Sequence, residues 1–286
     1  MSRSTGSRGF TLAFPASLVV LVIIVLPMIM MAIGSLRHAD PTAVVNAGLT
    51  LANYTRFVTD SFYLVIFFDT VKVALVCTVL ALVFGFPVAY FLARTQSRYK
   101  SLFIILLIFP LLVGSVVRSA GWMIILGHSG VINTLLGVFG LTTAPLQLLY
   151  TPAAVIVGTT GIVMPYLILT LQSVLEGLDF SVEEAAQSLG ASPMTAFFKI
   201  IVPIAAPGIA GGTVLVFILC MNAYATPVLL GGTGITMMAP ALYDQITKAA
   251  DWPFGSAMAI ILVTTTLLMA LLAHWLISRR YVKTMG

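Results

Sequence analysis

Charged side chains are scarce in this sequence of 286 residues. Asp, Glu, Lys and Arg make up 8% of the chain, whereas hydrophobic residues make up 60%, and the mean hydropathy is +1.10. The length would allow one or two ordinary soluble domains, but so little charge between long apolar runs is typical of a protein embedded in a bilayer. We therefore predict an all-α integral membrane protein.

Cysteine and histidine are also rare. Cys77 and Cys220 both fall inside apolar runs, which argues against an extracellular disulfide framework and favours a packing role. His38, His128 and His274 lie in separate regions without the spacing of metal ligands. We therefore expect no metal site.

Motifs for nucleotide chemistry and covalent catalysis are missing as well. The sequence contains no G-x-x-x-x-G-K-[ST] phosphate-binding loop, so the chain should not hold ATP by that device. It also offers no nucleophile, general base and orienting group that belong together. We expect neither an enzymatic activity nor a bound cofactor in this chain.

Six apolar segments are long enough to cross a membrane. A helix needs roughly 20 apolar residues to span a hydrocarbon core of about 30 Å. The segments lie near residues 11–35, 66–93, 102–126, 152–175, 204–230 and 254–278. The first is too long for the apolar part of a signal peptide, so we interpret it as a retained anchor.

The basic residues indicate the orientation of these spans, because Lys and Arg in short loops are retained in the cytoplasm. One set of loops, with both termini, carries Arg3, Arg8, Arg94, Arg98, Lys100, Lys199, Arg279, Arg280 and Lys283. The opposite loops carry only Arg37, Arg56 and Lys248. Both termini should therefore be cytoplasmic, and the pI near 9.4 reflects this topology rather than nucleic-acid binding.

No linker, composition break or internal repeat divides the chain, so one membrane domain over residues 1–286 is the simplest interpretation. The outer connections at 36–65, 127–151 and 231–253 are nearly neutral. The cytoplasmic segment 176–203 is exceptional, because it is both long and polar.

This cytoplasmic segment contains helix start and stop signals. Ser181 with Glu184 three residues later matches a capping box, which predicts a helix start. Gly190 suits the end of that helix, because glycine adopts the left-handed conformation without a Cβ penalty. Ser192 and Pro193 then match an N-cap and a first helical position. The pattern predicts two short helices joined by a tight glycine turn.

Each short helix has an apolar face, which needs a hydrophobic neighbour. The residues that can form these faces are Ala185, Ala186 and Leu189 on the first helix, and Phe197, Ile200 and Ile201 on the second. The ends of the protein's own spans account for part of this need. A compact knob of this kind also suits insertion into a cleft on a partner.

The spacing within the knob resembles a known motif, formed by Glu184, Ala185, Ala186, Gly190, Ile200, Val202 and Pro203. It is similar to the cytoplasmic EAA loop of permease subunits in bacterial ABC importers, with Val202 in place of the usual leucine. This resemblance implies that Glu184, Ala185, Ala186 and Gly190 dock into a groove of a separate ATPase subunit. That subunit would bind ATP and Mg, in agreement with the missing phosphate-binding loop.

The resemblance extends from about Leu49 to the last span. The stretches "LTLANYTRFVTD", "RSAGWMIILGHSGVINTLLG", "PLQLLYT", "TPVLLGG" and "DWPFGSAMA" are similar to the first membrane subunit of spermidine/putrescine-type importers. This similarity implies a MetI-like, type I importer fold in the bacterial inner membrane, surrounded by lipid. It also implies two ATPase subunits, a second permease subunit forming a heterodimer, and a periplasmic solute-binding protein.

Few charges fall inside the spans. Asp69 and Lys72 lie three apart on one helical face, and we interpret them as a pair that lowers the cost of insertion. Arg118 would lie about 24 Å along the third span, near the outer interface. There we favour snorkelling or structural pairing over contact with a substrate.

In the fifth span, small residues come first and polar residues follow. Gly208 and Gly212 form a small-xxx-small pair that permits close helix contact. Asn222, Tyr224 and Thr226 follow at mid and outer membrane depth, where polar groups should face a cavity or another helix. The resemblance places them on the translocation path, but interhelical hydrogen bonding explains them equally well.

The fourth span should be a kinked helix packed closely on its neighbours, because it contains Gly158, Gly161 and Pro165. Gln172 in this span is a further candidate for the path, although packing also explains it. The outer segment 236–250 reads as an amphipathic helix at the periplasmic surface, which would receive the binding protein or simply pack there.

We consider two classes of transporter for this sequence. A secondary transporter or channel would be expected to have discontinuous helices, intramembrane acids or an inverted repeat, and the spans offer only Asp69. We therefore favour a permease half of an ATP-driven importer that alternates between inward- and outward-facing states. Polyamine is the favoured solute, but the path residues include no acid for a polycation. An amino-acid-like compound, an opine, a phosphonate or iron stays an alternative.

Overall fold

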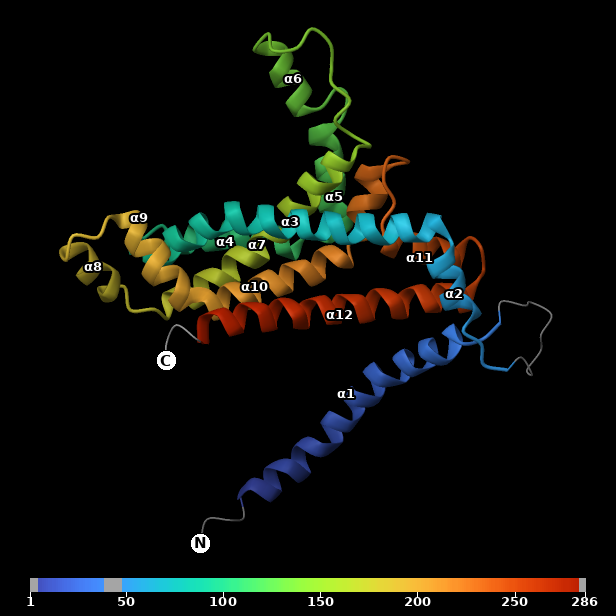
Figure 1. Cartoon of the computed structure of the whole chain (residues 1–286). Helices are drawn as coiled ribbons and strands as arrows, with labels where there is room; N and C mark the ends of the chain where they lie inside the picture. Colours follow the sequence, from blue (N-terminus) through green and yellow to red (C-terminus); the bar gives the residue numbers. More distant parts are fainter. Residues whose placement is uncertain (1–4, 39–47, 283–286) are drawn as a thin grey trace. The chain divides into compact units, whose positions relative to one another are not determined.

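Helices are the only regular structure in residues 5–38 and 48–282, which the computed structural model describes (Figure 1). Arg3 and Lys283, used above to orient the chain, lie outside these residues. The chain forms two compact units, one of residues 1–64 and 242–263, the other of residues 65–241 and 264–286. Three helices contribute to both units. That residues 1–286 form a single functional domain stays a prediction.

The first unit is built around the end of α1. It contains α1 (Thr5–Ser35), α2 (Ala52–Thr59), the start of α3 (Ser61–Arg94), the end of α11 (Met238–Thr247) and the first part of α12 (Trp252–Val282). The side-chain amide of Asn53 donates to the carbonyls of Ser35 and Arg37, at 2.8 Å in each case. Because the last carbonyls of a helix have no partner within it, Asn53 holds α2 against the end of α1.

Arg56 fixes α2 to the start of α12. Its Nη1 lies 2.8 Å from Asp251 Oδ2, and its guanidinium lies 4.0 Å from the ring centroid of Phe254. Tyr63 packs against Phe254 edge to face, with 4.7 Å between the ring centroids. The structure thus brings together the "NYTRFVTD" and "DWPFGSAMA" stretches, which lie almost 200 residues apart.

The second unit holds most of the helices. It contains the rest of α3, α11 and α12 together with α4 (Lys100–Leu112), α5 (Ser115–Leu126), α6 (Val131–Val138), α7 (Pro152–Glu176), α8 (Ser181–Ser188), α9 (Pro193–Ala196), the π-helix η1 (Phe197–Ile201), α10 (Val202–Met221) and the π-helix η2 (Pro227–Gly231). α7 is its centre, with thirteen buried residues and neighbours in α4, α5, α10 and η2.

The predicted small-xxx-small contact is confirmed between α10 and α7. A Cβ on Gly208 would collide with the side chain of Val174, and one on Gly212 would lie 3.1 Å from Leu167 Cδ1. The contact moves back along α7 as it moves forward along α10, so the two helices are antiparallel. Glycine permits this approach because it presents no side chain.

Six helical segments among the described residues are long and apolar enough to cross a membrane, as predicted. They are Leu18–Ser35, Ser61–Arg94, Ser115–Val138, Pro152–Glu176, Pro193–Met221 and Trp252–Ala273. The prediction of a third span at 102–126 is wrong. The chain there forms two helices, α4 and α5, and the segment that qualifies begins at Ser115.

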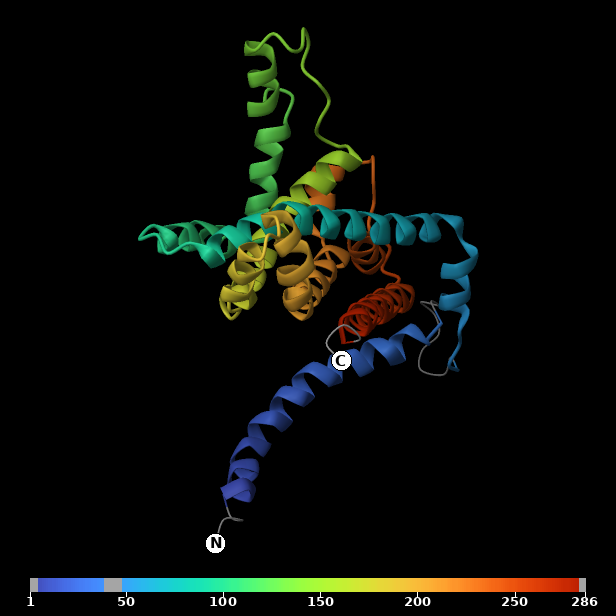
Figure 2. The same ribbon diagram turned by 60° about the vertical axis from the view of Figure 1, so that its left-hand side comes forward.

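The break between α4 and α5 comes from the backbone. Pro110 lies in the last turn of α4, and Val113 and Gly114 both have extended ψ angles, 132° and 149°. Proline cannot donate to the helix ladder, and two extended residues cannot continue it. Both ribbon views show α5 leaving in a direction different from that of α4 (Figure 1, Figure 2).

The fifth span also differs from its prediction. Its helix is continuous from Pro193 to Met221, so the second short helix of the knob is the first part of the span. The π-helix η1 lies within it, before Pro203, whose missing N–H leaves the Lys199 carbonyl without its usual partner. The helix ends at Met221, and the prediction that the span continues to residue 230 is wrong.

Three smaller expectations have different outcomes. The predicted helix in 236–250 is confirmed as α11, where the Met238 N–H donates to Thr70 Oγ1 at 2.8 Å. The predicted pairing of Asp69 with Lys72 is wrong, because no ion pair joins these two described residues, and Lys72 is exposed. Cys77 and Cys220 are free and fully buried, which agrees with packing roles.

Candidate functional site

The first helix of the cytoplasmic knob, α8, begins at Ser181 as predicted, but not through a capping box. The N-cap position is Phe180, and the Ser181 side chain does not cap the helix. Instead the Ser181 N–H donates to Asp179 Oδ1 at 2.9 Å. This hydrogen bond lowers the pKa of the Asp179 carboxyl below its usual 3.8, because the donor favours the charged form. Asp179 therefore takes the place predicted for the Glu184 side chain, whereas the Glu184 N–H donates to the Phe180 carbonyl.

The predicted glycine turn is confirmed in detail. Gly190 has a φ of +95°, and its N–H donates to the Gln187 carbonyl at 3.0 Å. The Ala191 N–H donates to the Ala186 carbonyl, also at 3.0 Å. These two bonds form a Schellman motif, which satisfies the last carbonyls of α8 and reverses the chain.

The start of α9 also agrees with its prediction. Pro193 is in the first turn, and Ser192 Oγ accepts from the Thr195 N–H at 3.2 Å. The turn between α8 and α9 is therefore fixed at both ends. The knob is a preformed body rather than a loose loop.

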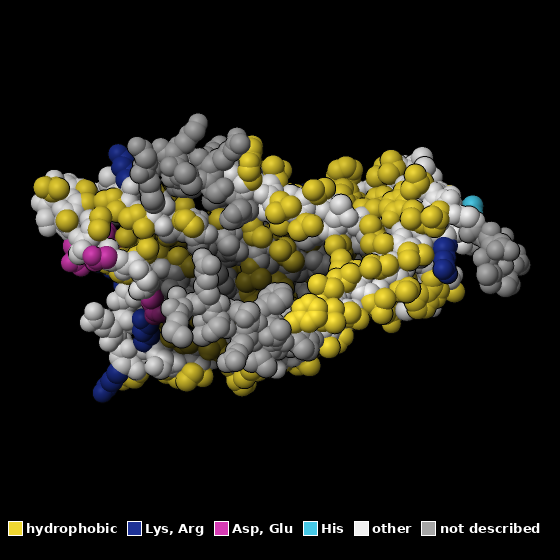
Figure 3. Space-filling model, turned by 90° about the horizontal axis from the view of Figure 1, so that it is seen from below, with side chains coloured by type: hydrophobic (Ala, Val, Ile, Leu, Met, Phe, Trp, Pro, Cys, Tyr) yellow, Lys and Arg dark blue, Asp and Glu magenta, His cyan; other side chains and the backbone are white. Residues whose placement is uncertain are grey.

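The residues predicted to dock a partner lie on the surface of the knob. The Glu184 side chain is 71% exposed, Ala185 is exposed, and Ala186 is half-buried. Gly190 has open space around it, and the neighbouring Leu189 is 90% exposed. Figure 3 shows acidic and basic side chains gathered on the left, the side on which Figure 1 labels α8. A partner could reach this surface, and the docking role stays a prediction.

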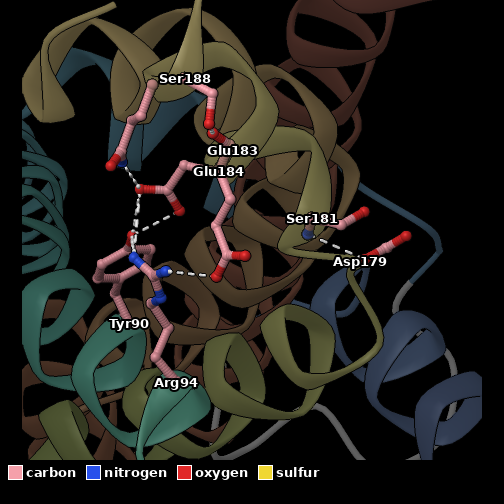
Figure 4. A network of polar contacts seen from close by, with 8 residues as sticks. Tyr90, Arg94, Asp179, Ser181, Glu183, Glu184 and Ser188 are labelled. Carbon is pink, nitrogen blue, oxygen red and sulfur yellow. Dashed lines mark hydrogen bonds and ion pairs between the residues drawn. The ribbon is translucent and has the colours of Figure 1, made fainter.

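Glu183, which the sequence did not single out, is the buried acid of the knob. Its side chain is 2% exposed, and the Tyr90 hydroxyl lies 2.9 and 2.8 Å from its two carboxylate oxygens. Arg94 Nη1 lies 3.3 Å from Oε1, and Gln187 Nε2 donates to the same oxygen at 3.1 Å. Figure 4 shows Tyr90 and Arg94 rising from α3 toward this carboxylate.

Arg94 also reaches the second glutamate. Its Nη2 lies 3.7 Å from Glu184 Oε1, so one guanidinium stands between a buried and an exposed carboxylate. The guanidinium lies 5.2 Å from the ring centroid of Phe180 and 5.7 Å from that of Tyr90. Aromatic faces attract such a cation, and they hold Arg94 in place.

An apolar groove runs beside this network, between α3 and the helix that continues from α9 into α10. Its volume is about 460 Å³. The side chains that border it include Phe86 and Pro87 of α3, and Phe197, Phe198, Val202 and Ala206 of the other helix. Phe86 and Phe197 meet edge to face at 5.5 Å, so the two helices touch but are not closely packed along their length.

Gln172 lies at the base of the knob, where α7 ends. It is buried, and its Nε2 donates to Glu176 Oε1 at 3.1 Å, while Lys100 Nζ lies 2.6 Å from the same oxygen. This network joins the end of α7 to the start of α4. Gln172 follows Gly158 by fourteen residues, about 21 Å along α7.

The other three candidate path residues lie near the opposite end of α7. Thr226 Cγ2 is 3.2 Å from the position of a Cβ on Gly158. Thr226 is buried, with its Oγ1 3.4 Å from Ser119 Oγ on α5, whereas Asn222 and Tyr224 are exposed. The Asn222 amide donates to the Ile218 carbonyl of its own helix at 2.9 Å. The structure therefore separates Gln172 from these three, and their role in the path stays a prediction.

Arg118 makes a structural contact. Its Nη1 donates to the Ile162 carbonyl of α7 at 3.1 Å, while its Nε is buried without a hydrogen-bond partner among the described residues. The half-buried side chain joins α5 to α7, which agrees with the structural pairing expected of it. The predicted depth of Arg118 in the membrane assumed a single span at 102–126. It does not apply, because that segment forms two helices.

The chemistry available at the knob is that of binding. It offers carboxylates, one guanidinium and exposed apolar side chains, held by short helices. Within residues 5–38 and 48–282, no three His, Cys, Asp or Glu side chains gather as metal ligands. The arrangement suits attachment to another protein.

Comparisons with known proteins agree with this arrangement. A family model described as "Binding-protein-dependent transport system inner membrane component" matches residues 78–281. The spermidine/putrescine transport system permease protein PotB of Escherichia coli K12 is 35% identical over 254 residues, which cover 89% of this chain and 92% of PotB. The PotB of Haemophilus influenzae is 34% identical over 224 residues, 78% of this chain and 77% of that protein.

A solved structure shares the fold at low identity. One chain of a bacterial alginate ABC transporter, in complex with a periplasmic protein that binds an alginate pentasaccharide, superposes with a TM-score of 0.72 at 17% identity. The match covers 92% of this chain and 91% of the other. At this identity the likeness concerns the fold alone.

Proposed function

This chain belongs to the family of binding-protein-dependent transport system inner membrane components, and from that membership we propose that it is the polyamine-conducting permease subunit of an ABC importer. It is a multi-pass protein of the inner membrane. The solute class rests on the PotB relatives, which match most of the chain.

The observation that carries the proposal is the continuity of the knob with a membrane span. The exposed surface around Glu184 and Gly190 connects through α9 and η1 to α10 without a break between Pro193 and Met221. A force applied to this surface therefore moves a span directly. Such a lever is of use to a transporter whose energy comes from a second protein.

That second protein is a cytoplasmic ATPase, present as a dimer, which binds ATP and Mg in its own sites. Glu184, Ala185, Ala186 and Gly190 dock into it. A second permease subunit completes the path in a heterodimer, and a periplasmic binding protein delivers the solute. Both termini lie on the cytoplasmic side with the knob, as the distribution of Lys and Arg favours.

The path residues differ in their exposure. The exposure of Asn222 and Tyr224 supports a role along the path, because an exposed polar group at membrane depth should face a cavity or another helix. The burial of Thr226 and Gln172 favours packing for these two. Specificity would then reside mainly in the binding protein.

Transport by the purified complex tests the proposal. A tag on this chain recovers the complex from native membranes, and the complex is reconstituted in liposomes with its binding protein. We expect ATP-dependent uptake of labelled spermidine or putrescine, and none with a nonhydrolysable ATP analogue. Uptake of an anion such as molybdate in place of polyamine would refute the solute class, and uptake without ATP would refute the ABC mechanism.

A further inference from the structure

We propose that Glu183 is a positioning residue that ties the coupling helix α8 to span α3, so that the motion of the knob reaches α3 as well as α10. The proposal rests on the proposed function, because it concerns how work done by an ATPase enters the membrane. It separates two adjacent glutamates: Glu184 faces the partner, and Glu183 holds the knob to its own spans.

The first support is the burial pattern of α8. Among the eight described residues of this helix, only Glu183 is buried. Its apolar neighbours face outward, since Val182 is 46% exposed and Leu189 is 90% exposed. A short helix in a globular structure is normally held by an apolar stripe. Of the apolar residues of α8 only Ala186 is half-buried, and α8 contacts α9 and η1 within the knob, so its attachment to α3 depends on the contacts of its acids with Tyr90 and Arg94.

The second support is the geometry of those contacts. Tyr90 reaches both carboxylate oxygens of Glu183, and Arg94 reaches one of them. Both partners lie on α3, one turn apart, while Gln187 holds the same carboxylate from within α8. A buried charge is costly unless it is paired and hydrogen-bonded, and directional bonds to one helix fix the orientation of another. An apolar side chain would fill the space without fixing that orientation.

The third support is the incomplete packing between α3 and the helix that includes η1. The groove of about 460 Å³ lies between them, next to the network. The ring contacts of Phe197 with Phe86 and Tyr90 join α3 to η1 at the edge of the groove, whereas the tie through Glu183 joins α3 to α8. If the tie is lost, these ring contacts no longer fix the orientation of α8 relative to α3, while α10 stays covalently continuous with the knob.

The experiment compares two readouts in the reconstituted complex of this chain, its ATPase, its second permease and its binding protein. One is the amount of ATPase that co-purifies, and the other is solute transported per ATP hydrolysed. We expect Glu183→Gln and Tyr90→Phe to retain the ATPase but to lower the transport ratio at least about fivefold, the lower range of typical coupling between sites. Ser188→Ala is the matched control, since it removes a hydrogen bond within α8, from Ser188 Oγ to the Glu184 carbonyl, and no contact with Glu183.

A reversible cross-link distinguishes a tie from a general folding role. In a Cys77→Ala/Cys220→Ala background, the substitutions Tyr90→Cys and Glu183→Cys supply two thiols that a bis-methanethiosulfonate reagent joins. We expect the transport ratio to be low before cross-linking, to recover when the link forms, and to fall again after reduction. Damage to folding would not respond in this way.

Each outcome decides the proposal. An unchanged transport ratio in Glu183→Gln and Tyr90→Phe overturns it, and so does loss of the ATPase from both variants, which would make Glu183 a docking residue. A cross-link that forms without restoring the ratio also overturns it. If the unmodified complex shows no ATP-driven uptake, the proposed function itself fails, whereas failure of the variants alone removes only the tie.

Discussion

Gly208 of α10 lies so close to the side chain of Val174 of α7 that no Cβ fits between them. The neighbouring Gly211 has open space on the same helix. Two glycines three residues apart thus have opposite roles. One permits the central helix contact of the second unit, whereas a Cβ on the other would meet no atom within 4 Å among the described residues.

Substitution at these two positions should therefore differ in effect. Gly208→Val forces α10 away from α7, and we expect a destabilisation of about 1–3 kcal/mol, the usual cost of overpacking. Gly211→Val should change stability by less than about 0.5 kcal/mol, as is usual for surface substitutions. Thermal unfolding in detergent measures both, and Val174→Ala should partly restore Gly208→Ala. Equal losses at both glycines would contradict the packing described here.

The contact of α5 with α7 gives a second prediction. A Cβ on Gly161 would lie 2.5 Å from Cζ2 of Trp122, so Gly161→Ala should displace the indole and loosen α5. Gly121→Ala, in open space beside the same tryptophan, is the control. We expect limited proteolysis after α5 to accelerate in Gly161→Ala only, and Trp122→Phe to relieve the effect. No change in Gly161→Ala would mean that α5 does not pack here.

The turn of the knob gives a third prediction, which depends on backbone conformation alone. Gly190 has φ +95° and nothing near it, so Gly190→Ala introduces strain without a clash, about 1–2 kcal/mol for a left-handed residue. Gly177→Ala, at φ −79°, should be tolerated. We expect Gly190→Ala to reduce ATPase co-purification while the unfolding temperature of the spans is preserved. Full retention of the ATPase would count against docking through this turn.

The start of α8 gives a prediction about pH. The pKa of Asp179 is lowered in the fold by the Ser181 N–H, so its contribution is complete above the unfolded value of 3.8 and is lost as pH falls through the lower folded value. A spin label at Ser188→Cys should therefore be more mobile in Asp179→Ala than in the parent chain at pH 7. The difference should vanish at strongly acid pH. Asp179→Asn, which keeps an acceptor, should resemble the parent at pH 7.

Hydropathy predicts most of the spans but cannot locate their breaks. Residues 102–126 are apolar enough for one crossing, and the extended backbone that divides them lies at Val113 and Gly114, neither of which has a polar side chain. α10 ends at Met221, but the apolar residues interspersed with Asn222, Tyr224 and Thr226 kept the segment apolar enough to predict a span to residue 230. Local signals were more reliable at Gly190 and Pro193, because turn chemistry is determined by the residues themselves.

The distinction between Glu183 and Glu184 lay beyond sequence reasoning. Both are acids in the first turn of α8, and the motif resemblance points to Glu184. Burial of Glu183 is decided by Tyr90 and Arg94, about ninety residues earlier in the chain. The predicted capping box does not form, because the Ser181 N–H donates to Asp179 and the Glu184 side chain is paired with Arg94. Local sequence patterns identify candidate residues, and contacts with residues distant in the sequence determine which candidate is buried.

The π-helical segment Phe197–Ile201 determines the rotational orientation of the knob around the axis of α10. A π turn holds one more residue than an α turn, and each residue of an α-helix advances by about 100°. The number of residues between Ala196 and Val202 therefore determines the direction, around the axis of α10, in which Glu184 and Leu189 point. Removal of a single residue from this segment would leave Glu184, Ala185, Ala186 and Gly190 unchanged and would turn the docking face toward another side of the span.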